Sequence, residues 1–279
     1  MAAWGLASFG TPPFYGKQSA PCIRRCARPR RRRAPVSVEN GDVACVVLLR
    51  HGESEFNAAE RFTGWTDAEL TEKGRRQARR AGRLLREAGH DFDFVLTSWL
   101  RRAVRTAWLA VEEMDRMWLP VESHWRLNER HFGAFEGFTR SEVVARWGEE
   151  PMRRIHERPP AMAVDDERHP ARADRYRGLP VAGRPAGEGF DDLIERVRPV
   201  FEERIAPAAR HGGSVLVVAH GVVVRALDRL LGQGSLGGLP VPVPPATPLV
   251  YRLDQGQVRS RDWLGELEMV KGSLPSGAG

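Results

Sequence analysis

Two apolar runs of this chain each end in a histidine that is followed by a glycine. The run VACVVLL leads into Arg50 and His51, and the run SVLVVA leads into His220. Both runs have the uninterrupted, β-branched pattern of strands that are buried on both faces of a sheet. Ligands of open α/β sheets bind outside the carboxyl ends of the strands. We therefore expect His51 and His220, although far apart in the sequence, to face one pocket.

A histidine beside an arginine at such a strand end is suited to phosphoryl transfer. The unperturbed pKa of imidazole is about 6.5, so a neutral histidine is a nucleophile near pH 7 without a strong base to activate it. Attack on phosphorus would form a phosphohistidine, and guanidinium groups bind phosphate oxygens in pairs. The sequence has neither a Walker-type phosphate loop nor an obvious aspartate cluster for a metal ion. We expect phosphohistidine chemistry that uses no metal.

Further phosphate-binding groups follow the first of these runs. Residues 53–57 and 61–65 place hydroxyl, amide, guanidinium and glycine backbone donors just beyond the expected strand. Residues 101–106 begin a helix after another expected strand, and the amino end of that helix adds its dipole to the charge of Arg102. Asn57 and Thr63 are also suited to turn or helix-capping roles.

Strands and helices alternate along most of the chain. We expect strands at Val43–Leu49, Phe94–Thr97, Leu119–Ser123, Ser214–Ala219 and Leu249–Leu253, and helices over residues 71–89, 99–115, 190–205 and 222–231. This order predicts a three-layer α/β/α fold with a mostly parallel central sheet. Residues 150–188 are rich in Arg, Pro and Asp and show little periodicity, so we expect a long excursion without regular structure that acts as a lid.

The positive charge of the chain is concentrated at its beginning. Residues 1–38 hold eight basic side chains and no acidic one; removing these eight from the 43 basic residues leaves 35 against 36 acidic ones, a formal charge of −1. An Arg-rich, acid-poor leader without an apolar core is typical of an organelle transit peptide, for a plastid or a mitochondrion. The alternative is a disordered basic tail on a cytoplasmic protein. Nucleic-acid binding is disfavoured because no aromatic residues interleave the arginine run.

Length and cysteine content limit the remaining possibilities. The apolar segments after about residue 43 are evenly spread, so we expect one catalytic domain over residues 39–270, followed by a flexible tail over residues 271–279. The three cysteines are too few and too unevenly placed for a disulfide framework or a zinc site. No apolar stretch has the length of a membrane span, so we expect no membrane partner.

Several longer segments resemble one known family. LLRHGESEFNAAERFTGWTDAELTEKG, TSWLRRAVRTAW, MWLPVESHWRLNERHFGAFEG, RRIHERPP, DERHP and VLVVAHG are similar to segments of the 2,3-bisphosphoglycerate-dependent phosphoglycerate mutases of the histidine phosphatase superfamily. The similarity extends over about residues 43–266. The RHGE segment alone would identify the superfamily, whereas LNERHFG and the paired arginines of residues 153–154 point to the mutase branch.

The resemblance implies roles for individual residues. His51 matches the histidine that is phosphorylated, and Arg50, Arg102 and His220 match the groups that surround the transferred phosphoryl group. Glu129 matches the general acid and base, a role that requires burial to raise its pKa; an ordinary surface carboxylate is the alternative. The residues expected to bind substrate are Ser54, Asn57, Arg61, Thr63, Gly64, Arg130, Phe132, Arg140, Arg153, Arg154, Gly221 and Val222. Solvated helix charges are the alternative for Arg153 and Arg154.

Three departures from the family pattern bear on the reaction. Phe132 stands where the family usually has a tyrosine, Arg140 replaces a usual lysine, and Val222 and Val223 stand where Asn and Ser are typical. Phe132 and the two valines remove side-chain donors from the expected substrate contacts, whereas Arg140 keeps the charge and replaces a point donor with a planar fork. They keep open a phosphohistidine-dependent phosphatase on the same fold, in which water accepts the phosphoryl group.

The resemblance predicts a phosphoglycerate mutase of glycolysis and gluconeogenesis. It would interconvert 3-phosphoglycerate and 2-phosphoglycerate through phosphorylated His51, with 2,3-bisphosphoglycerate as primer and no metal. The expected partners are small phosphoglycerates and further copies of the chain, in a homodimer or homotetramer. The alternatives are the phosphatase and, from another class, a catalytically weak binding or regulatory protein.

Overall fold

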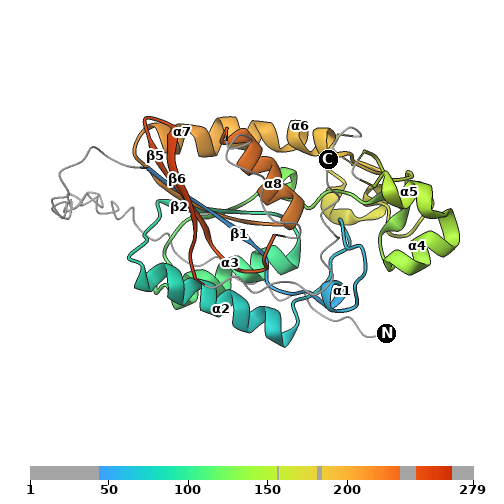
Figure 1. Cartoon of the computed structure of the whole chain (residues 1–279), viewed down its shortest axis with the longest axis horizontal. Coiled ribbons are helices and arrows are strands. Elements are labelled where there is room, and N and C mark those ends of the chain that lie inside the picture. The colour runs from blue at the N-terminus through green and yellow to red at the C-terminus, as the bar shows by residue number, and fades with distance from the viewer. Residues whose placement is uncertain (1–43, 156, 181–183, 233–242, 266–279) are drawn as a thin grey trace, which may run out of the picture. The chain divides into compact units, whose positions relative to one another are not determined.

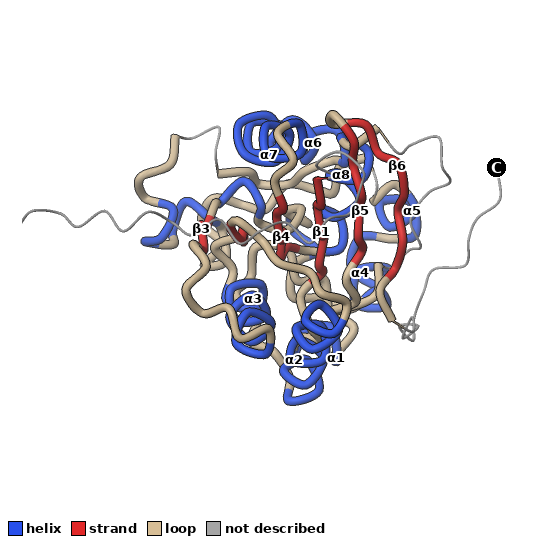
Figure 2. Tube along the Cα trace, turned by 90° about the vertical axis from the view of Figure 1, so that its left-hand side faces the viewer, coloured by secondary structure: helices blue, strands red, loops and turns tan. Residues whose placement is uncertain are grey.

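A six-stranded sheet forms the middle of the computed structural model, which describes residues 44–155, 157–180, 184–232 and 243–265. The strand order is β3-β2-β4-β1-β5-β6, and Figure 2 shows most of these strands side by side. The strands are β1 (Ala44–Arg50), β2 (Phe94–Thr97), β3 (Val121–Ser123), β4 (Ser214–Ala219), β5 (Leu249–Asp254) and β6 (Gln257–Trp263). The first four strands in chain order are mutually parallel, and β5 and β6 extend the sheet in antiparallel fashion.

The register of the two central strands brings their last residues together. β1 pairs in parallel with β4, and Arg50 lies opposite Ala219. His51 and His220 therefore leave the sheet at the same edge, as expected from the sequence. Leu48 and Val217 are almost completely buried, which agrees with the continuous apolar pattern of both strands.

Helices cover both faces of the sheet, so the predicted three-layer α/β/α fold is confirmed. Helices α2 (Glu72–Glu87) and α3 (Arg101–Glu113) lie on one face. Helices α6 (Phe190–Val200), α7 (Ala206–Arg210) and α8 (Gly221–Leu230) lie on the other (Figure 1). Each face has its own apolar core, one packed under α2 and α3 and one under α6 and α8. A π turn at Phe201–Ile205 joins α6 to α7.

The excursion predicted to lack regular structure is instead folded and packed. It follows helix α4 (Arg140–Trp147) and contains α5 (Glu149–Arg153) and two 3-10 turns, Pro170–Arg172 and Asp174–Tyr176. Phe135, Val143, Met152 and Ile155 form a small core of their own. Apolar residues are spaced too irregularly here for a periodic pattern, yet tertiary packing buries them, so the expectation of an unstructured segment was wrong.

Strand β6 is the one strand that the sequence analysis did not predict. It pairs only with β5 and leaves alternate residues exposed, so the polar sequence QVRSRDW lacks the apolar run of a buried strand. The expected leader and the whole of the expected tail lie outside the described residues. All described residues belong to one unit, Asn40–Gly279. None of the described helices combines the length and the apolar character that crossing a membrane requires.

Two glycines allow helix α2 to approach the end of β1 closely. A Cβ atom on Gly52 would lie 2.2 Å from the carbonyl oxygen of Gly74, and one on Gly74 would lie 2.0 Å from the carbonyl oxygen of Glu53. The amide of Glu53 also donates to the side-chain oxygen of Gln77 at 2.9 Å. The loop that follows His51 is thereby packed directly on the first turns of α2.

This close approach predicts that Gly74→Ala destabilises the protein although alanine is the better helix former. The higher helix propensity of alanine adds about 1 kcal/mol to the stability of the helix. The new methyl group, however, would clash with backbone atoms that cannot move away, which lowers the stability of the protein by about 2 kcal/mol or more. Urea unfolding of the full chain measures the difference. Gly178→Ala is the control, because a Cβ atom there meets nothing within 4 Å; equal effects of the two substitutions would contradict the packing argument.

Candidate active site

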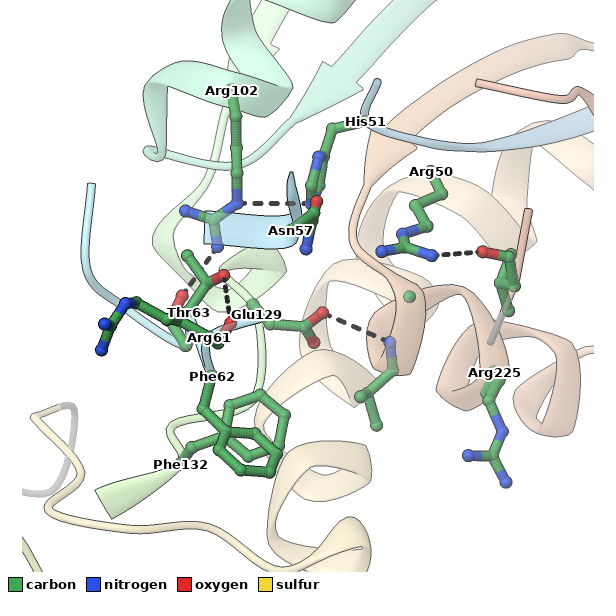
Figure 3. A pocket seen from close by; sticks show the side chains of 14 residues that line it. Arg50, His51, Asn57, Arg61, Phe62, Thr63, Arg102, Glu129, Phe132 and Arg225 are labelled. Atoms are coloured by element: carbon green, nitrogen blue, oxygen red, sulfur yellow. Dashed lines mark hydrogen bonds between the residues drawn. The ribbon is translucent and has the colours of Figure 1, made fainter. Parts of the chain in front are cut away.

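A cavity of about 210 Å³ opens at the carboxyl ends of β1 and β4 (Figure 3). It is formed by the ends of these strands, the loop before α2, the start of α3, the loop after β3 and the start of α8. The lining residues are Arg50, His51, Asn57, Arg61, Phe62, Thr63, Gly64, Arg102, Glu129, Phe132, Gly221, Val222, Arg225 and Val243. Most of the residues predicted from the sequence to act together thus meet in one place.

His51 is held in its neutral form. Its Nδ1 lies 2.6 Å from the carbonyl oxygen of Gly52, which can only accept, so Nδ1 carries the proton and Nε2 carries the lone pair. Burial lowers the pKa of His51 well below its ordinary value, and the nearby charges of Arg102 and Arg50 lower it further. The imidazole is therefore neutral at physiological pH, with Nε2 as the nucleophilic atom.

His220 lies beside His51, with 5.0 Å between the ring centroids. Its Nε2 is 2.8 Å from the hydroxyl of Ser98, which also accepts from the amide of Leu100. When the hydroxyl of Ser98 donates to Nε2, the proton of neutral His220 lies on Nδ1. This buried Nδ1 atom has no hydrogen-bond partner in the described part of the chain. His220 is fully buried and does not line the cavity, but this unpaired donor lies close to His51.

Arg102 connects the nucleophile with the loop before α2. Its guanidinium is fully buried, and Nε donates to Nε2 of His51 at 3.3 Å. Nη1 donates to the carbonyl oxygen of Thr66 at 2.8 Å, and Nη2 to that of Gly64 at 2.7 Å. Burial lowers the pKa of Arg102 to about 10, so the side chain still carries its charge at pH 7. The interaction with Nε2 places this charge where a transferred phosphoryl group would lie.

Arg50 and helix α8 complete a site for an anion. Nη1 of Arg50 donates to the carbonyl oxygen of Val243 at 2.5 Å, while its buried Nε has no hydrogen-bond partner among the described residues. His220, the N-cap residue of α8, makes no side-chain capping hydrogen bond, and the amide of Val222 makes a long contact of 3.5 Å with Glu129. Free amides at a helix start and a guanidinium fork both bind phosphate oxygens. The nucleophile therefore faces a built phosphoryl site.

Glu129 supplies the carboxylate of the cavity. It is 8% exposed; Oε1 accepts from the amide of Arg130 at 2.8 Å, and Oε2 makes a long contact of 3.5 Å with the amide of Val222. In Figure 3 the carboxylate points toward the start of α8, with His51 and Arg102 on one side of it and the rings of Phe62 and Phe132 on the other. This position suits a group that exchanges a proton with the substrate.

The loop residues divide into those that face the cavity and those that support it. Thr63 and Gly64 line the cavity, whereas Ser54 is buried as the N-cap of α1 (Glu55–Ala58). Asn57 does both, since it lines the cavity and its Oδ1 accepts from the amide of Ser54 at 3.2 Å. The capping alternative for Asn57 therefore describes part of its role.

Four of the arginines expected to bind substrate do not line the cavity. Arg153 and Arg154 are exposed and pair with Glu150 and Glu157, each one helical turn away. Arg140 is exposed at the start of α4. Arg130 is buried, but its Nη1 donates to the carbonyl oxygen of Ile155 at 2.6 Å. Each of these four side chains contacts a nearby partner or solvent instead of the cavity. The placement of Arg153 and Arg154 matches the alternative of solvated charges.

Arg61 lines the cavity but its guanidinium is already engaged. Nη1 donates to the carbonyl oxygen of Gly137 at 2.6 Å and to the carboxylate of Glu142 at 2.9 Å. This pair joins the loop before α2 to the start of α4 rather than leaving a free cation in the cavity.

Two charged residues of the site, Arg225 and Glu136, were not predicted from the sequence. Arg225 lines the cavity from α8, and the signal that could have indicated it is its spacing of three residues from Val222, which places both on one helix face. Glu136 is fully buried; Oε1 accepts from the amides of Trp65 and Phe132 at 3.0 and 3.1 Å, and Oε2 from that of Thr66 at 3.1 Å. Burial raises the pKa of Glu136 to about 7. This carboxyl ties the loop of Gly64 to the loop of Glu129.

Comparisons with known proteins identify the family and similar folds. The family model described as histidine phosphatase superfamily (branch 1) matches residues 46–264. Among solved structures, a mycobacterial glucosyl-3-phosphoglycerate phosphatase is 24% identical with a TM-score of 0.57, over 81% of this chain and 99% of that chain. Mycobacterial hydrolase 1 is 26% identical with a TM-score of 0.56, over 82% and 99%. The protein YhfR of Bacillus stearothermophilus is 24% identical with a TM-score of 0.56, over 83% and 98%.

The environment of His51 and His220 predicts that neither ring titrates near pH 6.5. Because burial lowers both pKa values, the two imidazoles of the folded protein stay neutral until the pH falls well below the pKa of a free histidine. Their ring-proton chemical shifts should stay constant between about pH 8 and pH 6. Nuclear magnetic resonance with His51→Gln and His220→Gln to assign the signals measures this; an inflection near pH 6.5 in either assigned signal would contradict the burial argument.

Proposed function

Because the chain belongs to branch 1 of the histidine phosphatase superfamily, we propose that it is a phosphoglycerate mutase that works through phosphorylated His51. Members of this superfamily transfer phosphoryl groups. The observation that carries the proposal is the placement of the neutral Nε2 atom of His51 against Arg102, at a cavity that also holds one carboxylate, Glu129. A nucleophile, a cationic phosphoryl site and a proton donor are the three elements that the reaction needs.

The first step transfers a phosphoryl group to His51. Nε2 attacks the phosphorus of 2,3-bisphosphoglycerate, the primer, and a P–N bond forms as the bond from phosphorus to the bridging ester oxygen breaks. Glu129, in its protonated form, gives its proton to that leaving oxygen. Arg50, Arg102 and Nδ1 of His220 stabilise the charge on the phosphoryl oxygens, which is the role that a metal has in many other phosphoryl-transfer enzymes.

The second step returns the phosphoryl group to the other hydroxyl of a phosphoglycerate. Glu129, now deprotonated, takes the proton of the attacking hydroxyl, and the P–N bond to His51 breaks. The same carboxyl thus serves as acid in one direction and base in the other, as reversibility requires. Interconversion of 3- and 2-phosphoglycerate follows when the bisphosphate intermediate turns over in the cavity between the two transfers.

The charge of the cavity supports an acidic substrate. Arg50, Arg102 and Arg225 line it as cations, whereas the charge of Arg61 is paired with Glu142. This excess of cations favours a substrate that carries a second anionic group besides the phosphate that is transferred.

A phosphatase is the second candidate, and a specific observation favours it. Part of the wall near Glu129 is apolar: the rings of Phe62 and Phe132 lie 5.3 Å apart, and Val222 and Val243 also line the cavity. Arg153 and Arg154, expected to hold the substrate, face solvent. Such a wall offers fewer donors to a phosphoglycerate acceptor, and water would then accept the phosphoryl group. Mycobacterial hydrolase 1, a similar structure, is named as a hydrolase.

An assay of the full chain with 3-phosphoglycerate separates the two candidates. The mutase is expected to form 2-phosphoglycerate, faster when 2,3-bisphosphoglycerate is added to phosphorylate His51, and to release little inorganic phosphate. Both products are measured in the same reaction, without added metal. Phosphate release without 2-phosphoglycerate would overturn the mutase in favour of the phosphatase, and failure of either substrate to label His51 would favour a binding protein.

Replacement of the proposed acid and base tests the mechanism separately. Glu129→Gln keeps the shape of the side chain but cannot exchange a proton, so kcat should fall about a hundredfold or more. Steady-state kinetics with 3-phosphoglycerate measures the loss, and circular dichroism verifies the fold. The control is Glu150→Gln, which removes an exposed carboxylate paired with Arg153. Near-normal turnover of Glu129→Gln would remove this residue from the mechanism.

A further inference from the structure

We propose that Arg225 binds the carboxylate of the substrate and so selects phosphorylated acids over phosphate esters of neutral alcohols. This assignment rests on the proposed function, because it names what holds the second anionic group of a phosphoglycerate. The expected holders of that group, Arg153 and Arg154, face solvent in the structure. Arg225, by contrast, lines the cavity itself.

Arg225 differs from the other arginines of the cavity in its partners. Arg102 donates to His51 and to two backbone carbonyls, Arg50 to the carbonyl of Val243, and Arg61 to Glu142. Among the described residues, Arg225 takes part in no hydrogen bond and no ion pair; its guanidinium lies over the ring of Phe190, 5.5 Å from the ring centroid. It therefore keeps its donors for a ligand, while the ring supports the cation from one side.

The position of Arg225 suits the end of the substrate that does not react. The phosphoryl site is formed by His51, Arg102 and Nε of Arg50, on one side of Glu129. In Figure 3 Arg225 lies below Arg50, on the α8 side of the carboxylate of Glu129, and its guanidinium points away from His51. A substrate with its phosphate at His51 and its leaving oxygen at Glu129 extends its remaining atoms to this side of the cavity.

Electrostatics also favours an anion beside Arg225. The side chain is half-buried, and burial lowers its pKa, an effect that the charge of Glu129 opposes. A substrate carboxylate would add a further negative charge beside this cation, and a guanidinium binds a carboxylate in a planar, two-point arrangement that a lysine cannot reproduce.

A comparison of two matched ligands tests the assignment. 3-Phosphoglycerate and glycerol 3-phosphate have the same phosphate ester, but one has a carboxylate where the other has a hydroxymethyl group. We expect Arg225→Met to weaken the binding of 3-phosphoglycerate by roughly ten- to a hundredfold, as for a lost charged hydrogen bond. The binding of glycerol 3-phosphate should change by less than about threefold, because this ligand lacks the partner. Arg225→Lys should restore part of the preference.

Calorimetry on the full chain, with His51→Gln to prevent turnover, gives these dissociation constants. The matched control is Arg229→Gln on the same helix: Arg229 also lies over the ring of Phe190 but does not line the cavity, and it pairs with Asp191. Equal weakening of both ligands by Arg225→Met, no weakening, or a parent chain without preference for 3-phosphoglycerate would each overturn the proposal. Arg225→Gln replaces the methionine variant if circular dichroism shows that the latter is unfolded.

The mutase proposal can fail while this one stands. If the wild-type chain releases phosphate from 3-phosphoglycerate instead of forming 2-phosphoglycerate, the mutase is excluded, yet the carboxylate preference and its loss in Arg225→Met remain measurable. If products confirm the mutase but the preference survives in Arg225→Met, only the role of Arg225 is excluded.

Discussion

One buried cation, the guanidinium of Arg102, is the interaction on which the rest of the site depends. It is fully buried and donates at once to His51 and to the carbonyls of Gly64 and Thr66. Removing such a charge from water is costly unless hydrogen bonds replace the lost hydration. The loop before α2 supplies those bonds, so the same contacts that solvate Arg102 also position the cavity wall around the nucleophile.

Burial determines the chemistry of the remaining groups. His51 and His220 are kept neutral because they lie beneath packed helices and beside cationic arginines. The resulting cavity is electropositive toward a phosphoryl group, yet it has an apolar wall at Phe62 and Phe132. Glu136 links these parts, since its carboxyl accepts from backbone amides of both the Trp65 loop and the Phe132 loop. A substrate of this cavity must carry negative charge for the arginines and must also fit against the apolar wall.

The sequence-based expectations were accurate where a structural feature follows from neighbouring residues in the sequence, and inaccurate where it follows from contacts with distant segments. The ranges expected for β2 and β4 are those of the structure, because buried parallel strands need continuous apolar runs that few other elements require. The edge strand β6 and the folded segment after α4 were missed, because their pairing and burial come from distant partners. Arg153 and Arg154 were expected in the cavity only from the resemblance to the mutase family. In the structure each of them pairs with a nearby carboxylate instead.

The sequence by itself determined the strand ends at which His51 and His220 lie, the alternation of strands and helices, and the superfamily that the RHGE segment indicates. Only the tertiary structure decided which arginines reach the cavity and which pair with carbonyls or carboxylates, and that Arg225 has no such partner among the described residues. The physical reason is that residue order sets the periodicity of local elements, whereas the environment of a flexible charged side chain is set by elements packed against it from elsewhere in the chain.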